Sequence, residues 1–178
     1  MNGSPESRGT VDNRHPSLQD ADNMKEELRE LALLVVMTLS VGGAVFAADP
    51  RPPTTDDRCG VCGMYVFKYP NWVATVVFED GSQVFFDGPK DLFRYILDLE
   101  DYRAENREIS EIFVTDYYST EMIEADDAFF VSGSDVMGPM GPELVPIARE
   151  AHAETFVVDH GGQAVLRFGE ITREEIPR

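Results

Sequence analysis

Strand-like and helix-like segments follow one another in the same order twice along this chain, and this repetition limits the folds available to it. In the first half, residues 65–69 and 72–88 are rich in Val, Phe and Tyr, and the longer segment contains the pair Asp80-Gly81. Such a pair favours a tight connection between antiparallel strands. Residues 65–88 are therefore predicted to form a β-hairpin.

An amphipathic helix is predicted directly after this hairpin, over residues 88–102. Pro89 suits the first turn of a helix, and apolar residues such as Leu92 and Ile96 recur at helical spacing. Residues 110–119 return to a strand-like composition. The first half thus has the order strand, strand, helix, strand.

The second half contains similar segments. Residues 128–133 read as a strand, residues 138–162 as a helix that Gly161 suits as a C-cap, and residues 163–171 as a final strand. Only one strand is evident before this helix. Both helices follow Gly-Pro pairs. We predict an α+β fold of two related β-β-α-β units with antiparallel sheets, over residues 58–120 and 121–172.

An uncharged apolar run occupies residues 31–48 and contains Val45-Phe46-Ala47, the small-x-small pattern of an export cleavage site. We predict a signal peptide over residues 24–48 and an exported, periplasmic protein. A membrane anchor is the alternative, because about 18 apolar residues can just span a bilayer. Residues 1–23 are expected to be a disordered extension or the product of a misassigned start codon, and residues 49–57 a linker.

The charge of the chain argues against one class of partner. There are 33 acidic and 15 basic side chains, which give a net charge of −18. A nucleic-acid backbone would be repelled by this surface. We therefore expect no nucleic-acid partner, and we interpret most of the acidic residues as a solvated surface.

Both cysteines of the chain lie close together, as Cys59 and Cys62, and Met64 follows two residues later. This group is compatible with a disulfide, a redox couple, half of a zinc site or a site for a soft metal ion. An exported protein meets an oxidising compartment, where cysteines usually pair, but their spacing does not decide the matter.

Cu(I) is the metal that best suits this motif. If residues 62–64 enter the first strand in an extended conformation, the side chains of Cys62 and Met64 point to the same face. A thiolate and a thioether are soft donors that favour Cu(I). Zinc is disfavoured, because His152 and His160 form no pair with a matching Cys-x-x-Cys spacing.

A thiol-disulfide protein remains the second interpretation. A thioredoxin-like Cys-x-x-Cys needs a preceding strand and a following helix that lowers the pKa of the attacking thiol. Here a Pro-rich segment precedes the motif and a predicted strand follows it. No hydrolase or phosphate-binding motif is present in the chain, and we expect no enzymatic activity.

Two further methionines, Met137 and Met140, lie in a Gly/Pro-rich stretch before the second predicted helix. Glycine and proline there are compatible with thioethers displayed at the surface. On spacing alone, a methionine in such a place more often fills a gap in the core. His160, near the end of that helix, suits an interaction with the helix dipole.

Three blocks, at residues 56–72, 84–96 and 138–162, together make this chain resemble the NosL family, the accessory proteins of nitrous oxide reductase. The resemblance runs from about residue 56 to residue 170. It implies two β-β-α-β units and a Cu(I)-binding metallochaperone outside the cytoplasm, with nitrous oxide reductase or a related copper enzyme as the recipient. It does not imply a catalyst.

The resemblance also implies a ligand set. Cys62 and Met64 match the Cys-Gly-Met of the family, and Cys59 matches a cysteine often found upstream. Met137, Met140 and His160 match positions in the C-terminal blocks and are implied as further ligands.

Two departures from the family pattern concern lipid attachment and a histidine ligand. Many members carry a lipid-accepting cysteine after the apolar run, where this chain has Ala47, Ala48 and Asp49. Gly60 stands where some relatives have histidine.

Overall fold

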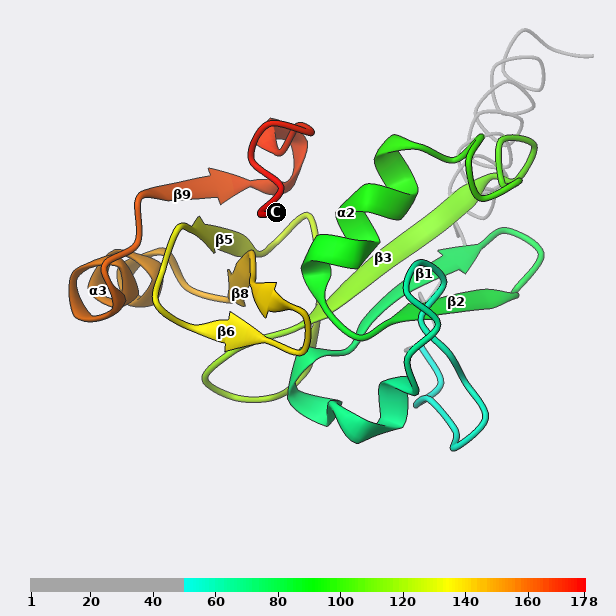
Figure 1. Ribbon diagram of the computed structural model, residues 1–178, viewed down its shortest axis with the longest axis horizontal. Coiled ribbons are helices and arrows are strands. Elements are labelled where there is room, and N and C mark those ends of the chain that lie inside the picture. Colours follow the sequence, from blue (N-terminus) through cyan, green and yellow to red (C-terminus); the bar gives the residue numbers. More distant parts are fainter. Residues whose placement is uncertain (1–49) are drawn as a thin grey trace, which may run out of the picture. The chain divides into compact units, whose positions relative to one another are not determined.

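The computed structural model describes residues 50–178, so the predictions for residues 1–49 lie outside it, whereas residues 50–57 of the proposed linker are described. Residues 74–124 form a four-stranded antiparallel sheet in the order β2-β1-β3-β4, with one helix beside it (Figure 1). Its elements are β1 (Ala74–Phe78), β2 (Gln83–Phe86), α2 (Pro89–Leu97), β3 (Ile109–Thr115) and β4 (Met122–Glu124).

The predicted turn at Asp80-Gly81 connects β1 to β2. Gly81 has a φ of 77°, which glycine adopts without strain, and its N–H donates to the carbonyl of Phe78. The apolar residues of α2 face the sheet, and Leu92 and Phe93 are fully buried. The predicted hairpin turn, helix and third strand are therefore present, but the helix ends at Leu97 and the strand at Thr115.

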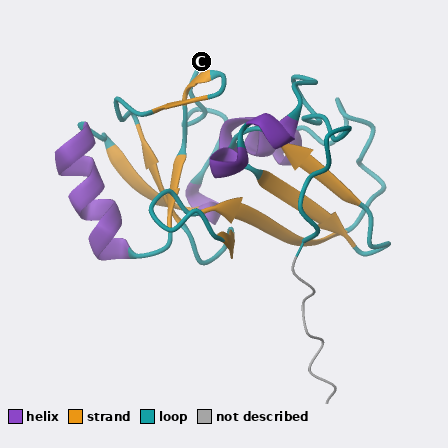
Figure 2. Cartoon of the chain, turned by 90° about the horizontal axis from the view of Figure 1, so that it is seen from below, coloured by secondary structure: helices purple, strands orange, loops and turns teal. Residues whose placement is uncertain are grey.

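A second sheet, in the order β8-β5-β9, repeats this topology. In both sheets the first strand is central, the next strand lies on one side, and the strand after the helix lies on the other. Figure 2 shows α3 lying along the smaller sheet. The elements are β5 (Phe129–Ser132), β8 (Val145–Ile147), α3 (Glu150–His160) and β9 (Ala164–Arg167), with a β6–β7 hairpin (Met137–Gly138 and Gly141–Pro142) inserted after β5.

Two predicted elements were wrong. Residues 138–149 are not helical: they contribute β6, β7 and β8, and α3 begins only at Glu150. Pro146 lies in β8 and would lack a hydrogen-bond donor inside a helix, whereas an edge strand tolerates it. This strand completes the second β-β-α-β order. Residues 65–69 form no strand either; the 3-10 helices Val66–Lys68 and Pro70–Trp72 occupy this region.

The hydrophobic core continues between the two sheets. Phe93 of α2 packs edge-on against Phe130 of β5, with ring centroids 5.1 Å apart, and both are buried. Leu144 belongs to the same buried cluster, as does Cys59. Gly161 caps α3 in the left-handed conformation, as predicted. Within residues 50–178, neither helix has the length and apolar character required to cross a bilayer.

The segment just before the cysteines is held against the first sheet. The guanidinium of Arg51 binds the carboxylate of Asp57 at 2.7 Å and lies over the ring of Phe85 at 4.5 Å. This guanidinium holds the pKa of Asp57 well below its usual range. Asp57, just before the cysteine loop, is therefore held near β2 through Arg51.

Candidate metal centre

A tight loop places the two cysteines next to the end of β2. It closes through hydrogen bonds from the Cys59 N–H to the Met64 carbonyl (2.8 Å) and from the Gly63 N–H to the Cys59 carbonyl (3.0 Å). Gly63 has a φ of 74°, so residues 62–64 are not extended, and the predicted strand geometry for Cys62 and Met64 was wrong. Both cysteines nevertheless lie in one loop with Met64.

Gly60 lets this loop lie against β2. Its N–H donates to the carbonyl of Phe85, and a Cβ at this position would come within 2.7 Å of Val84 Cγ1. The close packing explains why a glycine suits this position. It also brings the loop to the point where β2 ends and α2 begins.

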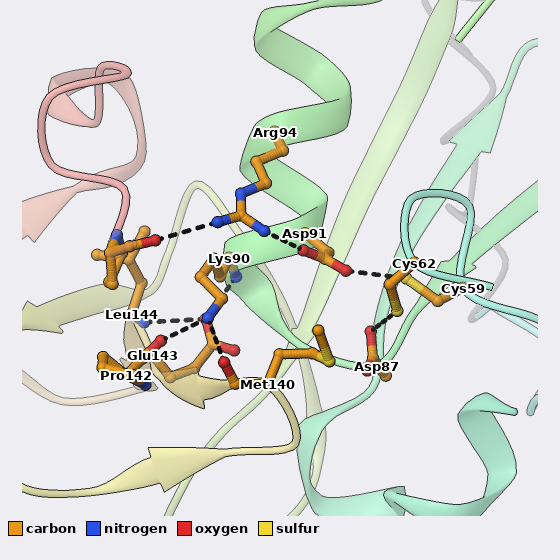
Figure 3. A network of polar contacts seen from close by, with 11 residues as sticks. Cys59, Cys62, Asp87, Lys90, Asp91, Arg94, Met140, Pro142, Glu143 and Leu144 are labelled. Atoms are coloured by element: carbon orange, nitrogen blue, oxygen red, sulfur yellow. Dashed lines mark hydrogen bonds and ion pairs between the residues drawn. The ribbon is translucent and has the colours of Figure 1, made fainter. Parts of the chain in front are cut away.

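Two aspartates at that junction complete the site. Asp87 directly follows β2, and Asp91 lies in the first turn of α2. Cys59 Sγ donates to Asp91 Oδ2 and Cys62 Sγ donates to Asp87 Oδ1, each at 3.3 Å (Figure 3). One potential ligand atom from each of the four residues lies within 4.8 Å of the other three.

Burial controls the chemistry of the thiols. It raises the pKa of Cys62 to about 11, although the Met64 N–H partly opposes this shift, and it raises the pKa of the nearly inaccessible Cys59 further. Both thiols are therefore neutral near pH 7 in the metal-free protein, and neither is bonded to the other.

The carboxylates are held differently. Asp91 Oδ1 accepts from the Arg94 guanidinium at 3.0 Å, while its other oxygen accepts from Cys59. Asp87 is equally buried, but within residues 50–178 its Oδ2 has no hydrogen-bond partner. A buried oxygen without a partner is costly, and a bound cation would relieve that cost.

Met140 approaches this group from the second unit. It lies in the turn of the β6–β7 hairpin, and its side chain projects toward Cys62 and Asp87 (Figure 3). Lys90 binds its backbone carbonyl at 2.8 Å. Met140 is 45% exposed, so its thioether is accessible from solvent. The Met140 thioether thus faces the cysteine loop.

The other two predicted ligands are Met137 and His160. Met137, on the same hairpin, is 57% exposed. His160 ends α3, where its ring packs on Phe156 at 4.3 Å and its Nδ1 lies 3.1 Å from Asp135. His160 is not part of the four-residue group, which is the only such cluster of His, Cys, Asp and Glu in the described range.

The donor set is therefore mixed. Two thiols and a nearby thioether suit a soft ion such as Cu(I), whereas the two carboxylates suit harder ions, and cysteine with aspartate is also compatible with zinc. Sequence reasoning missed Asp87 and Asp91. The available signal was two acids four residues apart at a strand-to-helix junction in one of the family-like blocks.

Comparisons with known proteins agree on one family. The NosL family model matches residues 50–176. The copper-binding lipoprotein NosL of Stutzerimonas stutzeri is 30% identical over 124 residues, which cover 65% of this chain and 62% of that protein. The chain thus matches less than two thirds of that relative's length.

Two solved structures are also similar to this chain. The copper chaperone NosL from Shewanella denitrificans is 27% identical, with a TM-score of 0.61 over 70% of this chain and 96% of the other. The apo-NosL protein from Achromobacter cycloclastes is 29% identical, with a TM-score of 0.43 over 58% of this chain and 87% of the other. The α+β fold with antiparallel sheets agrees with the Shewanella structure.

Proposed function

We propose, from the premise that this chain belongs to the NosL family, that it is a metallochaperone that carries Cu(I) outside the cytoplasm. The named relatives are a copper-binding lipoprotein and a copper chaperone, which are binding proteins and not enzymes. The observation that carries the proposal is the convergence of Cys59 and Cys62 with two buried carboxylates. Copper is the cargo of this site.

Loading would require the thiols to lose their protons. Metal ions bind the thiolate form, so copper displaces protons from groups whose pKa is otherwise raised by burial. Cys59 and Cys62 would supply two soft ligands, and Met140 a third. Met64 remains a family-implied ligand in the same loop. His160 would not belong to the resting ligand set, because it lies outside the cluster. Met137, on the same hairpin as Met140, remains a family-implied ligand.

Release would proceed from the exposed side of the site. Cys62 is partly exposed and Met140 is accessible, while Cys59 is buried. An acceptor ligand can therefore join the copper from the side of Cys62 before the buried thiolate leaves. We propose nitrous oxide reductase, or a related copper enzyme, as the acceptor. The acidic surface of the chain would favour docking to a basic patch.

Competition titration tests the proposal. The reduced full-length chain is titrated with Cu(I) against a chelator of known affinity, and the Cys62→Ala variant is compared with Ser134→Ala, a control outside the cluster. We expect Cys62→Ala to lower Cu(I) affinity by at least about 100-fold, while the control binds like wild type. Unchanged binding in Cys62→Ala would refute the proposal, as would a preference for Zn²⁺ over Cu(I).

Export is part of the same proposal. The apolar run at residues 31–48 would direct the chain to the periplasm, or hold it at the membrane if it is not cleaved. Although the Stutzerimonas relative is a lipoprotein, Ala47, Ala48 and Asp49 provide no lipid-accepting cysteine here. The intact mass of protein recovered from a periplasmic fraction would show whether cleavage occurs.

A thiol-disulfide function is the second candidate, favoured by two free thiols within 4.8 Å of each other. Such a protein would keep the metal site of a partner reduced. The raised pKa of both thiols opposes this function, because the attacking species is a thiolate. Measurement of the reduction potential decides: a Cys59–Cys62 couple that cycles at the periplasmic poise would favour it over copper transport.

A further inference from the structure

A buried lysine connects the helix of the metal centre to the hairpin that carries Met140. Lys90 lies in α2 next to Asp91 and is only 2% exposed. Its Nζ donates to the carbonyl of Met140 at 2.8 Å and to that of Pro142 at 2.9 Å (Figure 3). Both acceptors belong to the backbone of the β6–β7 hairpin region. One side chain therefore fixes this hairpin against α2.

A buried glutamate makes the reverse connection. Glu143 follows the hairpin, and its Oε1 accepts from the N–H of Lys90 at 2.5 Å and from its neighbour Leu144 at 3.0 Å. It thereby satisfies one of the free N–H groups at the start of α2. Lys90 reaches from helix to hairpin, and Glu143 reaches from hairpin to helix.

Two glycines make room for this glutamate. A Cβ at Gly88 would come within 2.3 Å of Glu143 Oε2, and a Cβ at Gly138 would come within 2.9 Å of the same atom. Gly88 belongs to the first unit and Gly138 to the hairpin of the second. The carboxyl group of Glu143 is therefore packed between the two units. This close packing restricts movement of the hairpin relative to α2.

Burial of Lys90 and Glu143 is not explained by a gain in folding stability. Burying an amino group and a carboxyl group costs desolvation free energy, and apolar side chains of similar volume often stabilise a core as well or better. Directional hydrogen bonds to backbone atoms fix a single geometry, which apolar contacts do less well. The geometry fixed here is the position of the Met140 backbone relative to α2.

We propose that Lys90 and Glu143 are positioning residues that hold the Met140 thioether beside Cys59 and Cys62, so that it can serve as a copper ligand. This inference rests on the proposed function. The two residues do not touch the metal. They act through the hairpin backbone, and their effect on copper binding therefore requires the Met140 side chain.

A double-mutant cycle in the full-length chain tests this dependence. Cu(I) affinity is measured for wild type, Lys90→Met, Met140→Leu and the double variant, with circular dichroism to verify folding. We expect each single variant to bind about tenfold more weakly, and the double variant to bind no more weakly than Met140→Leu alone. Glu143→Leu should lose affinity as Lys90→Met does, and Glu143→Gln, which keeps the accepting oxygen, should restore most of it.

Gly138→Ala provides a second route if Lys90→Met does not fold. It keeps both Lys90 and Glu143 and displaces the glutamate side chain from the hairpin side. Its effect on Cu(I) affinity should be about threefold and should also vanish when Met140 is leucine. X-ray absorption of copper-loaded Gly138→Ala should show an average sulfur count between those of wild type and Met140→Leu.

Two results would overturn the inference. If the losses of Cu(I) affinity in the single variants multiply in the double variants, then Lys90 and Glu143 act independently of Met140. Wild-type Cu(I) affinity in Met140→Leu would mean that the thioether is no ligand. Either result leaves the proposed function intact as long as Cys62→Ala still loses copper, so the two failures are distinguishable.

Discussion

Cys62 Sγ donates to Oδ1 of Asp87 at 3.3 Å, while the other oxygen of the same buried carboxylate has no partner within residues 50–178. The carboxylate thus favours the protonated thiol in the metal-free protein. It also places negative charge beside the position where a cation would bind. The same carboxylate therefore opposes thiolate formation in the metal-free protein and attracts the cation whose binding favours the thiolate.

Asp87→Asn should make Cys62 more reactive. The amide removes a negative charge that opposes thiolate formation, so the pKa of Cys62 should fall and its thiolate population rise, about tenfold for each pKa unit. The rate of iodoacetamide labelling at pH 8, followed by peptide mass spectrometry, measures this change. Cys59, which is buried, should label slowly in both proteins. Equal Cys62 rates would contradict the assigned role of Asp87.

Gly88→Ala should destabilise the fold. The new methyl group would overlap Glu143 Oε2, which is buried and cannot move into solvent. We expect a loss of about 1–3 kcal/mol in the free energy of unfolding, measured by urea denaturation. Gly169→Ala is the matched control, since nothing lies within 4 Å of its Cβ position. Similar losses in both variants would argue against the packing described for Glu143.

The sequence was sufficient to predict most of the fold. The Asp80-Gly81 turn, the apolar spacing in α2 and the Gly161 cap are local signals, and each structure they predict is present. β8 was missed because Leu144 and Ile147 also fit a helical stripe. It forms a strand because it pairs with β5, and this pairing involves residues that are distant in the sequence.

Half of the candidate site was also out of reach for local reasoning. The thiols of Cys59 and Cys62 are neighbours in sequence, but Asp87 and Asp91 join them only because the loop lies along the edge of β2. Gly63 reverses the backbone before Met64, which no periodicity argument could foresee. Met140 is about fifty residues from Lys90 in the sequence, and the hydrogen bond between them holds it near the site.

The buried Glu143 should make stability depend on pH. Burial raises its pKa to about 8, with Lys90 opposing and Asp91 reinforcing the shift. Because the folded protein holds this proton more tightly than the unfolded chain, its contribution is fully present below about pH 4.5 and is lost as the pH rises through 8. The loss should not exceed about 1.4 kcal/mol per pH unit.

Glu143→Gln isolates this contribution. The variant has no titrating group at this position, so the difference in unfolding free energy between it and wild type should grow in favour of the variant from pH 5 to pH 8. Other carboxylates cancel in the difference. A difference that is constant with pH would show that Glu143 titrates normally.

X-ray absorption at the copper edge of the Cu(I)-loaded full-length chain tests the account most directly. The structure predicts a first coordination shell with at least two sulfur atoms, from Cys59 and Cys62, and a third that disappears in Met140→Leu. A shell made only of oxygen and nitrogen would contradict the assignment of this thiol pair as the copper site.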